Sequence, residues 1–246
     1  MSIEVQVIGK QTLWLSQTAI NSGIGLEHFS PEYLLHQQLV SRTATGRGTV
    51  YFFSPPKSHS TMVLRAYLRG GLVAKFNRNI FWFSGTKNIR CAKELAILQH
   101  LQKHHVNVPK PIAAMASKHL LGYSASIITG AIENAQELHS MLTLHSVDNS
   151  VWAKVGQEIK KMHNAGVCHD DINVKNVLID KQQQVHLLDF DKCDITPGTH
   201  WQSANLARFK RSIDKQVSMQ KKAGKDYFVD SAHWQALVDG YEQYKA

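Results

Sequence analysis

The stretch that decides the fold of this chain lies at residues 169–180 and reads His169-Asp170-Asp171-Ile172-Asn173-Val174-Lys175-Asn176-Val177-Leu178-Ile179-Asp180. A second stretch follows shortly after it and reads His186-Leu187-Leu188-Asp189-Phe190-Asp191. Two short apolar runs, at 177–179 and 185–188, flank a polar turn, and this pattern is typical of a β-hairpin. The hairpin would bring Asn176 and Asp189, one at each of its ends, close together.

The polar side chains of these two stretches suit phosphoryl transfer. An acceptor hydroxyl must be oriented and must lose its proton, so we expect Asp171 to act as the catalytic base or orienting carboxylate. Mg²⁺ prefers hard oxygen ligands, so we expect Asn176 and Asp189 to hold the metal. Their order matches the kinase pattern H-R-D-L-x-x-x-N and then D-F-G, with Asp170 and Asp191 in the Arg and Gly positions. The alternative interpretation is a solvated acidic turn.

A glycine-bearing turn lies within residues 43–53, well ahead of the stretch at 169–191 in which we expect catalysis, called the catalytic stretch below. Glycines let backbone amides approach phosphate groups closely, and a neighbouring cation adds charge. We therefore expect Gly46, Arg47 and Gly48 to bind the phosphates of ATP. An ordinary hairpin turn is the alternative interpretation.

A phosphate-contacting cation and its carboxylate partner are expected further along the chain. Residues 61–67 alternate as a strand and carry Arg65 where kinases place a lysine that contacts the α- and β-phosphates. Lys75 is the alternative cation. Glu94 shares the apolar face of a predicted helix, where a charge needs a partner, and we expect that partner to be the phosphate-binding cation. A first-turn Glu favoured by the helix dipole is the other interpretation.

The pattern of the whole chain indicates an α+β fold of the bilobal, protein-kinase-like kind. We expect an N-lobe at 1–130, with an N-terminal extension, an antiparallel nucleotide-binding sheet and the Glu-bearing helix. The C-lobe, at 131–246, should be mostly helical, with the catalytic loop and basic C-terminal helices. Ser30 and Pro31 predict the start of a helix that runs to about Val40. Apolar residues at helical spacing predict a core helix that ends just before the catalytic loop: Val151, Val155, Ile159 and Met162.

Composition limits the partners. The 246 residues carry a formal net charge of +9 and a pI near 9.4, which indicates an anionic partner. A basic run at 208–215 and 221–225 has aromatic residues nearby, and such a surface would suit anionic lipid or a phosphorylated sugar. A solvated helix face is the alternative. The aromatic residues of this region are Trp201, Phe209, Tyr227, Phe228 and Trp234.

Targeting signals and metal-binding patterns are weak. The first six residues lack the layout of a secretory signal, so we expect no export. Three cysteines without a C-x-x-C unit fit a reducing compartment. His100 and His104 have the i, i+4 spacing of two zinc ligands, although no third ligand is evident in the sequence.

Three segments resemble one family. Residues 45–53, 63–75 and 169–178 together are similar to the 3-deoxy-D-manno-octulosonic acid (Kdo) kinase family, which belongs among the lipopolysaccharide kinases of kinase-like fold. The arginine-glycine-glycine segment at 69–71 is the most specific part, and the resemblance runs from about Phe29 to Tyr244.

The resemblance implies ATP-dependent phosphorylation of the Kdo 4-hydroxyl on Kdo-lipid IVA, or on a related anionic glycolipid. It further implies a peripheral protein on the cytoplasmic side of the bacterial inner membrane, with an anionic membrane surface and no nucleic acid as partner. Asp171 would be the catalytic aspartate, and Asp191 could itself approach magnesium. Two alternatives remain: another small-molecule phosphotransferase of heptose or aminoglycoside type, and a nucleotide-binding pseudokinase.

Overall fold

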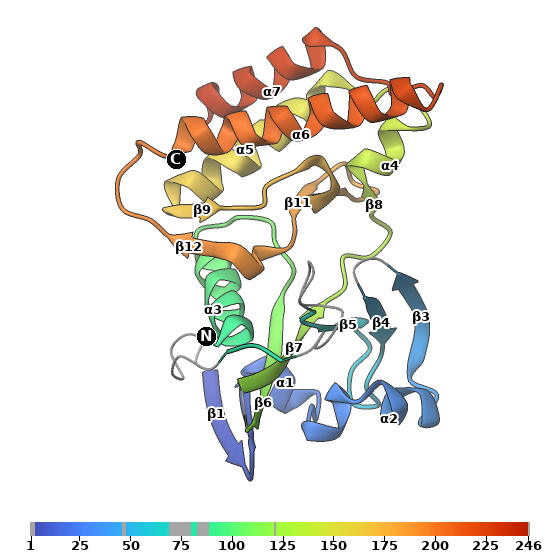
Figure 1. Ribbon diagram of the computed structural model, residues 1–246, viewed down its shortest axis with the longest axis vertical. Coiled ribbons are helices and arrows are strands. Elements are labelled where there is room, and N and C mark those ends of the chain that lie inside the picture. Colours follow the sequence, from blue (N-terminus) through green and yellow to red (C-terminus); the bar gives the residue numbers. More distant parts are fainter. Residues whose placement is uncertain (1–2, 46–47, 69–79, 83–88, 121, 246) are drawn as a thin grey trace. The chain divides into compact units, whose positions relative to one another are not determined.

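A computed structural model describes residues 3–45, 48–68, 80–82, 89–120 and 122–245. The chain forms two compact units (Figure 1). The first comprises Met1–Gln99 and Lys110–Ala131, and the second comprises His100–Pro109 and Ile132–Ala246. Together they contain a large antiparallel sheet and helices, which is compatible with a kinase-like fold. The predicted lobe boundary at 130/131 stays a proposal.

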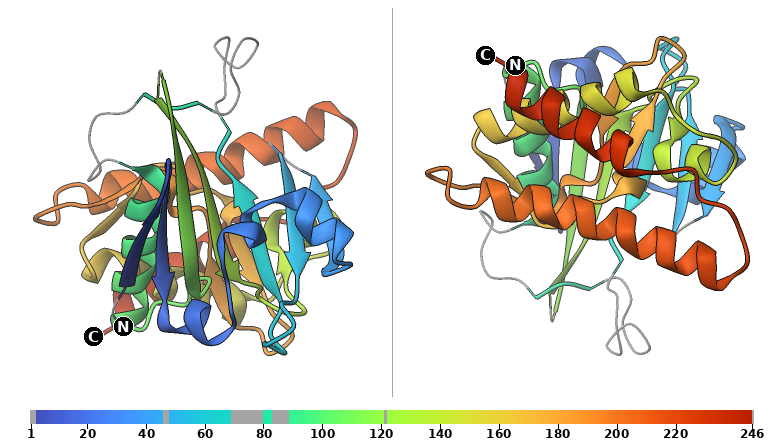
Figure 2. Two further views of the ribbon diagram at one scale, coloured as in Figure 1. Left: turned by 90° about the horizontal axis from the view of Figure 1, so that it is seen from below. Right: turned by 90° about the horizontal axis from the view of Figure 1, so that it is seen from above.

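The first unit is built on a seven-stranded sheet in the order β1-β2-β6-β7-β5-β4-β3, and each neighbouring pair is antiparallel. Figure 2 (left) shows these strands side by side. Hairpins join β1 to β2 and β6 to β7, so sequence neighbours pair directly. The strands are β1 (Ile3–Ile8), β2 (Gln11–Ser16), β3 (Val40–Thr45), β4 (Thr49–Phe53), β5 (Met62–Ala66), β6 (Pro111–His119) and β7 (Gly122–Gly130).

Short helices and one long helix accompany this sheet. Ser30 caps the start of α2, because its hydroxyl accepts a hydrogen bond from the Tyr33 amide at 3.2 Å, as the sequence predicts. The predicted extension to Val40 is wrong. The helix ends at His36, since Gln38 takes a left-handed backbone (φ 54°) and β3 begins directly afterwards. The helical segments are α1 (Gln17–Asn21), η1 (Leu26–Phe29), α2 (Pro31–His36) and α3 (Arg90–Lys103), whose last turn belongs to the second unit.

The second unit is mainly helical. Besides its helices it has a three-stranded sheet, β11-β10-β8, and a two-stranded pair, β12 with β9. The predicted core residues of α5 are all buried, which confirms that stripe as core. The elements are β8 (Gln136–Glu137), α4 (Leu138–Leu142), α5 (Asn149–Asn164), β9 (Val167–His169), η4 (Val174–Asn176), β10 (Val177–Ile179), β11 (Val185–Leu187), η5 (Phe190–Lys192), β12 (Cys193–Ile195), α6 (Gln202–Lys222) and α7 (Ser231–Gln243).

Helices α5 and α7 cross at a pair of glycines. A Cβ added at Gly156 would lie 2.0 Å from the Leu237 carbonyl oxygen, and one added at Gly240 would lie 2.1 Å from the Ala153 carbonyl oxygen. Both distances are far below van der Waals contact, so only glycine allows the two backbones to approach this closely. The crossing fixes α7 against the helix that leads into the catalytic stretch.

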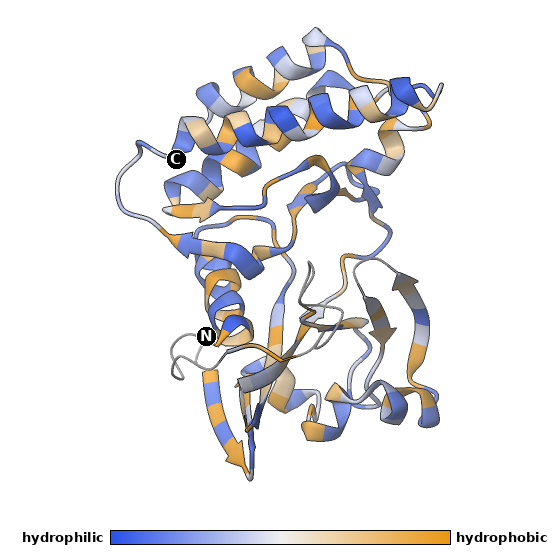
Figure 3. Cartoon of the chain, in the orientation of Figure 1, coloured by the Kyte–Doolittle hydropathy of each residue, from blue (hydrophilic) through white to orange (hydrophobic). Residues whose placement is uncertain are grey.

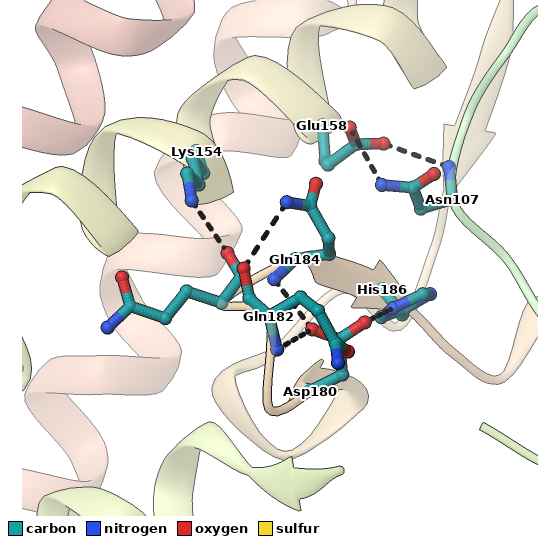
Figure 4. A network of polar contacts seen from close by, with 8 residues as sticks. Asn107, Lys154, Glu158, Asp180, Gln182, Gln184 and His186 are labelled. Atoms are coloured by element: carbon teal, nitrogen blue, oxygen red, sulfur yellow. Dashed lines mark hydrogen bonds and ion pairs between the residues drawn. The ribbon is translucent and has the colours of Figure 1, made fainter. Parts of the chain in front are cut away.

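The predicted hairpin is confirmed as β10 and β11, with Val177 opposite Leu187. Asp180 organises its turn, because its carboxylate accepts hydrogen bonds from the amides of Gln182 and Gln184 and from His186 (Figure 4). Burial opposes ionisation of Asp180, but these hydrogen bonds prevail and lower its pKa. The turn therefore holds the register of β10 and β11, which follow Asn176 and precede Leu188 in the sequence.

A buried carboxylate anchors the same hairpin from α5. Glu158 accepts a hydrogen bond from the Asn107 amide at 2.9 Å, and it pairs with Lys161 (Figure 4 shows the Asn107 contact). The Asn107 carbonyl in turn accepts from the Leu187 amide at 2.9 Å. Residues 100–109 belong to the second unit, and this contact joins them to its hairpin.

In the part of the chain that the structure describes, we find no helix with the length and apolar character needed to span a membrane.

Candidate active site

Arg65 and Glu94 meet within the first unit. The Nη2 atom of Arg65 lies 2.6 Å from Oε1 and 2.7 Å from Oε2 of Glu94. Glu94 is buried within α3, whereas the Arg65 side chain on β5 is 30% exposed. Burial of an unpaired carboxylate would be costly, so the ion pair explains how Glu94 can occupy an apolar helix face. The Arg65 side chain is thus partly exposed while it pairs with the buried carboxylate.

Tyr67 also belongs to this cluster, although it is not among the site residues predicted from the sequence. Its hydroxyl donates a hydrogen bond to Oε2 of Glu94. Burial, together with the negative charge of Glu94, raises the pKa of Tyr67 well above its usual value, so the hydroxyl keeps its proton and remains a donor. A signal was present, because residues two apart on a strand share one face and Tyr67 follows Arg65 by two.

The predicted phosphate-binding turn lies between β3 and β4. Gly46, Arg47 and the alternative cation Lys75 lie outside the described residues. Gly48 precedes β4, and a Cβ added there would lie 2.5 Å from the Leu68 Cδ1 atom. The antiparallel pairing of Thr45 with Thr49 shows that this turn connects a hairpin.

The catalytic stretch is held by His169, which lies at the end of β9 and is buried. Its Nδ1 atom accepts a hydrogen bond from the Asp171 amide at 3.3 Å, and its Nε2 atom lies 3.0 Å from the Leu188 carbonyl oxygen. One acceptor and one donor define the neutral Nε2–H tautomer. Burial lowers the pKa of His169, although the Leu188 carbonyl and the nearby aspartates oppose this effect. The imidazole therefore links the backbone of Asp171 to that of the residue before Asp189.

Two amide side chains fix the backbone of Asp171. The Nδ2 atoms of Asn173 and Asn176 both donate to the Asp171 carbonyl, at 2.7 and 3.0 Å. Asn173 also accepts a hydrogen bond from the Lys175 amide, and this forms the turn of η4. Since these contacts use the backbone of Asp171, the loop is held without engaging the carboxylate of that residue.

Leu188, the residue before Asp189, pairs with Asn176 across the hairpin. The Leu188 amide donates to the Asn176 carbonyl at 2.9 Å, and Asp189 follows in a left-handed backbone with φ 65° and ψ 63°. This conformation is uncommon for residues other than glycine, although aspartate tolerates it better than most. Asp191, the residue in the Gly position of the motif, lies two residues further on within η5.

The donor set of Asn176 and Asp189 fits a hard cation. The NH₂ end of Asn176 is engaged with Asp171, so its oxygen is the end that can face a cation, and Asp189 supplies a carboxylate. No group of three or more His, Cys, Asp or Glu residues with metal-binding geometry occurs among the described residues. The ring centroids of His100 and His104 lie 4.5 Å apart with the ring planes tilted by 51°, and Nε2 of His100 lies 2.7 Å from the Ala165 carbonyl oxygen.

The basic C-terminal run lies mostly on α6, whose residues are mostly hydrophilic (Figure 3). Trp201 and Phe209, two of the aromatic residues expected beside the basic run, are buried. They are core residues, because they lie on the apolar stripe that faces the rest of the unit. The exposed cations on the opposite stripe of the helix are Arg208, Arg211, Lys215 and Lys222.

The chain is similar to known proteins of one family. The model of the lipopolysaccharide kinase (Kdo/WaaP) family matches residues 32–241. A protein of Vibrio vulnificus (strain YJ016), named 3-deoxy-D-manno-octulosonic acid kinase, is 39% identical over 245 residues, which cover 98% of each chain. Proteins with the same name from Vibrio cholerae serotype O1 (strain ATCC 39315 / El Tor Inaba N16961) and Haemophilus influenzae (strain 86-028NP) are 41% identical over 188 residues and 39% over 223 residues. These alignments cover 76% and 88% of this chain and 79% and 90% of the relatives.

The fold and these matches define a kinase, that is, a phosphotransferase. The chain belongs to the lipopolysaccharide kinase (Kdo/WaaP) family. Membership of a kinase family implies ATP as the phosphoryl donor.

Proposed function

We propose that this protein transfers the γ-phosphoryl group of ATP to the 4-hydroxyl of the Kdo residue of Kdo-lipid IVA, in lipopolysaccharide core biosynthesis. The observation that carries the proposal is the 39% identity to a named Kdo kinase across 98% of both chains. The loop at 169–176 supports it, because it presents a carboxylate whose backbone is fixed on both sides.

Asp171 is the group that we assign to the acceptor hydroxyl. A carboxylate within hydrogen-bonding reach of the sugar hydroxyl would orient it and accept its proton as the bond to phosphorus forms. The hydrogen bonds from Asn173 and Asn176 to the Asp171 backbone favour this role, since they restrict the loop while the carboxylate stays available. Preorganisation of this kind reduces the reorganisation that transfer would otherwise need.

Asn176 and Asp189 are the residues that would hold Mg²⁺. When bound, the ion would neutralise phosphate charge and help to orient the triphosphate. The chain contributes the placement of both ligands, through the Leu188–Asn176 backbone bond and the left-handed backbone of Asp189.

Arg65 is the cation that we assign to the nucleotide phosphates, together with Gly46, Arg47 and Gly48 of the β3–β4 turn. The guanidinium can bridge two oxygens as a planar fork. Glu94 and Tyr67 support this assignment. Glu94 accepts a hydrogen bond from the guanidinium within the first unit, and Tyr67 holds the Glu94 carboxylate in place.

A peripheral position on the cytoplasmic side of the inner membrane is part of the proposal. Kdo-lipid IVA is an anionic glycolipid, so a basic surface would raise the local substrate concentration. Arg208, Arg211, Lys215 and Lys222 recur at i, i+3, i+7 and i+14, and this spacing places four exposed cations on one face of α6.

The deciding experiment is incubation of the purified protein with ATP, Mg²⁺ and Kdo-lipid IVA, followed by mass spectrometry. We expect a mass gain of one phosphate on the lipid, and NMR of the product should place it on the 4-hydroxyl. Heptose-containing lipid and an aminoglycoside serve as parallel acceptors. Transfer to one of those alone would contradict the proposal, and a Mg²⁺-dependent thermal shift with ATP but no product would indicate a pseudokinase.

A further inference from the structure

A chain of buried and partly buried hydrogen bonds connects the C-terminal helix to the catalytic stretch within the second unit. It begins at Tyr241 on α7, whose hydroxyl lies 2.8 Å from Nδ1 of His163 on α5. Nε2 of His163 lies 3.0 Å from Oδ1 of Asn205 on α6. Nδ2 of Asn205 then donates to the His169 carbonyl at 2.9 Å. His169 continues the chain to the Asp171 amide.

The direction of each hydrogen bond follows from chemistry. Asn205 donates through its NH₂ group to His169, so its oxygen must accept from Nε2–H of His163. A neutral imidazole with a proton on Nε2 has an acceptor at Nδ1, which accepts a hydrogen bond from the Tyr241 hydroxyl; at 2.8 Å this contact is shorter than the 3.4 Å from that hydroxyl to Oε1 of Gln202. Burial is the main reason why the pKa of His163 is lowered to about 4, so the ring is neutral at neutral pH.

The polar side chains of this network are buried, so their hydrogen bonds hold the surrounding main chain in place. His163 is 1% exposed, His169 is 1% exposed and Asn205 is 3% exposed. Buried polar groups rigidify a structure only when each of them is satisfied, and here every side-chain nitrogen and oxygen of Asn205 and His163 has a partner. An apolar trio of similar volume would fill the same space, but it would not hold the main chain of the loop.

We propose that Asn205 and His163 are positioning residues for phosphoryl transfer, which hold the His169 main chain and thereby the placement of Asp171 and Asp189. The inference rests on the catalytic role proposed for Asp171. His169 is the branch point, because its carbonyl is held by Asn205 while its ring contacts the Asp171 amide and the Leu188 carbonyl. A shift of His169 would therefore move both functional carboxylates at once.

The test compares steady-state kinetics with stability. Asn205→Asp has the same shape and still accepts from His163, but it replaces the donor to the His169 carbonyl with an oxygen. We expect kcat to fall roughly 10- to 100-fold, while KM for ATP changes less than about 2-fold, because misplacement by ~1 Å has effects of this size. His163→Leu should act in the same direction, whereas His163→Gln keeps a donor toward Asn205 and should restore most of the lost turnover.

His233→Gln is the matched control. His233 lies on α7, is buried, and makes hydrogen bonds to Ser146 and the Asp230 amide that do not lead to the catalytic stretch. We expect it to lower the melting temperature as Asn205→Asp does, with kcat within about 2-fold of the wild type. Equal kcat losses in both variants, or failure of His163→Gln to recover over His163→Leu, would overturn the proposal. Asp171→Asn, run in parallel, tests the role of Asp171 separately.

Discussion

Arg65 and Glu94 are 29 residues apart in the sequence, yet the guanidinium Nη2 of Arg65 lies 2.6 Å from the Glu94 carboxylate. A strand and a helix are thus joined by one buried, charge-assisted contact, and Tyr67 adds a second donor to the same carboxylate. The guanidinium lies 5.1 Å from the Tyr67 ring, which restricts it further. Glu94 and Tyr67 therefore restrict the orientation of the Arg65 guanidinium.

Arg65→Lys tests whether the fork geometry matters for nucleotide binding. The variant keeps the positive charge but loses the planar pair of donors, so we expect kcat/KM for ATP to fall roughly 10- to 100-fold. Steady-state kinetics at varied ATP concentration provide the measurement. Arg42→Lys, on the edge strand β3, is the control, since the Arg42 guanidinium lies 3.8 Å from the centroid of the Phe52 ring on β4. Similar losses for both variants would argue against a specific role of Arg65.

Tyr67→Phe should lower the free energy of unfolding by about 1–3 kcal/mol, because it leaves one oxygen of the buried Glu94 without its hydroxyl donor. Urea denaturation followed by circular dichroism measures the change. Tyr51→Phe, at a half-buried tyrosine on β4, removes a hydroxyl that makes no hydrogen bond among the described residues and should change stability by less than about 0.5 kcal/mol. An unchanged midpoint for Tyr67→Phe would show that water replaces the donor.

Asp171→Asn should reduce turnover roughly 10²–10⁴-fold and leave the fold intact. The contacts that hold the loop use the backbone of Asp171, so the amide variant retains them. We expect the melting temperature to stay within a few degrees of the wild type. Near-normal phosphate transfer by this variant would exclude Asp171 as the base.

Stability should fall in mild acid because of His163. Its pKa is about 4 in the folded protein, against 6.5 in an unfolded chain, so below pH 6.5 the unfolded state binds more protons. The difference lowers the free energy of unfolding by roughly 2 kcal/mol between pH 7 and pH 5. His163→Gln has no proton to gain, so its stability should decline less over this range. Parallel pH curves for the two proteins would contradict the assignment.

Gly240→Ala should destabilise the protein although alanine favours helices. In an open helix this exchange stabilises by about 1 kcal/mol, whereas here the methyl group would meet the Ala153 carbonyl at 2.1 Å. We expect a net loss of about 1–3 kcal/mol, measured by urea denaturation. A gain in stability would mean that α5 and α7 separate without strain.

The features predicted correctly from the sequence are those set by neighbouring residues. The Ser30 cap and the β10–β11 hairpin depend on local hydrogen bonds and short apolar runs, and both are found. The end of α2 was missed, because pairing of Val40 with β4 overrides the local helical tendency. Asn205 lies inside α6 and contacts His169 through the tertiary fold, so no local pattern could identify it.

The candidate site was likewise predicted only in part from the sequence. A cation partner for Glu94 could be predicted from the sequence because this carboxylate lies on an apolar helix face, and Arg65 could be named because it stands on a strand where kinases place a lysine. The left-handed backbone of Asp189 could not be predicted from the sequence, since aspartate has only a mild preference for that conformation. The roles of the predicted site residues in catalysis stay predictions until the variants are measured.

Gly156 and Gly240 each lie against the main chain of the other helix, so selection acts on two distant positions for the same reason. A larger residue at either place would push the helices apart, and a change at the other place could not compensate, because the obstacle on each side is main chain. Natural variants of this protein should therefore keep both glycines, or lose both along with the helix crossing itself.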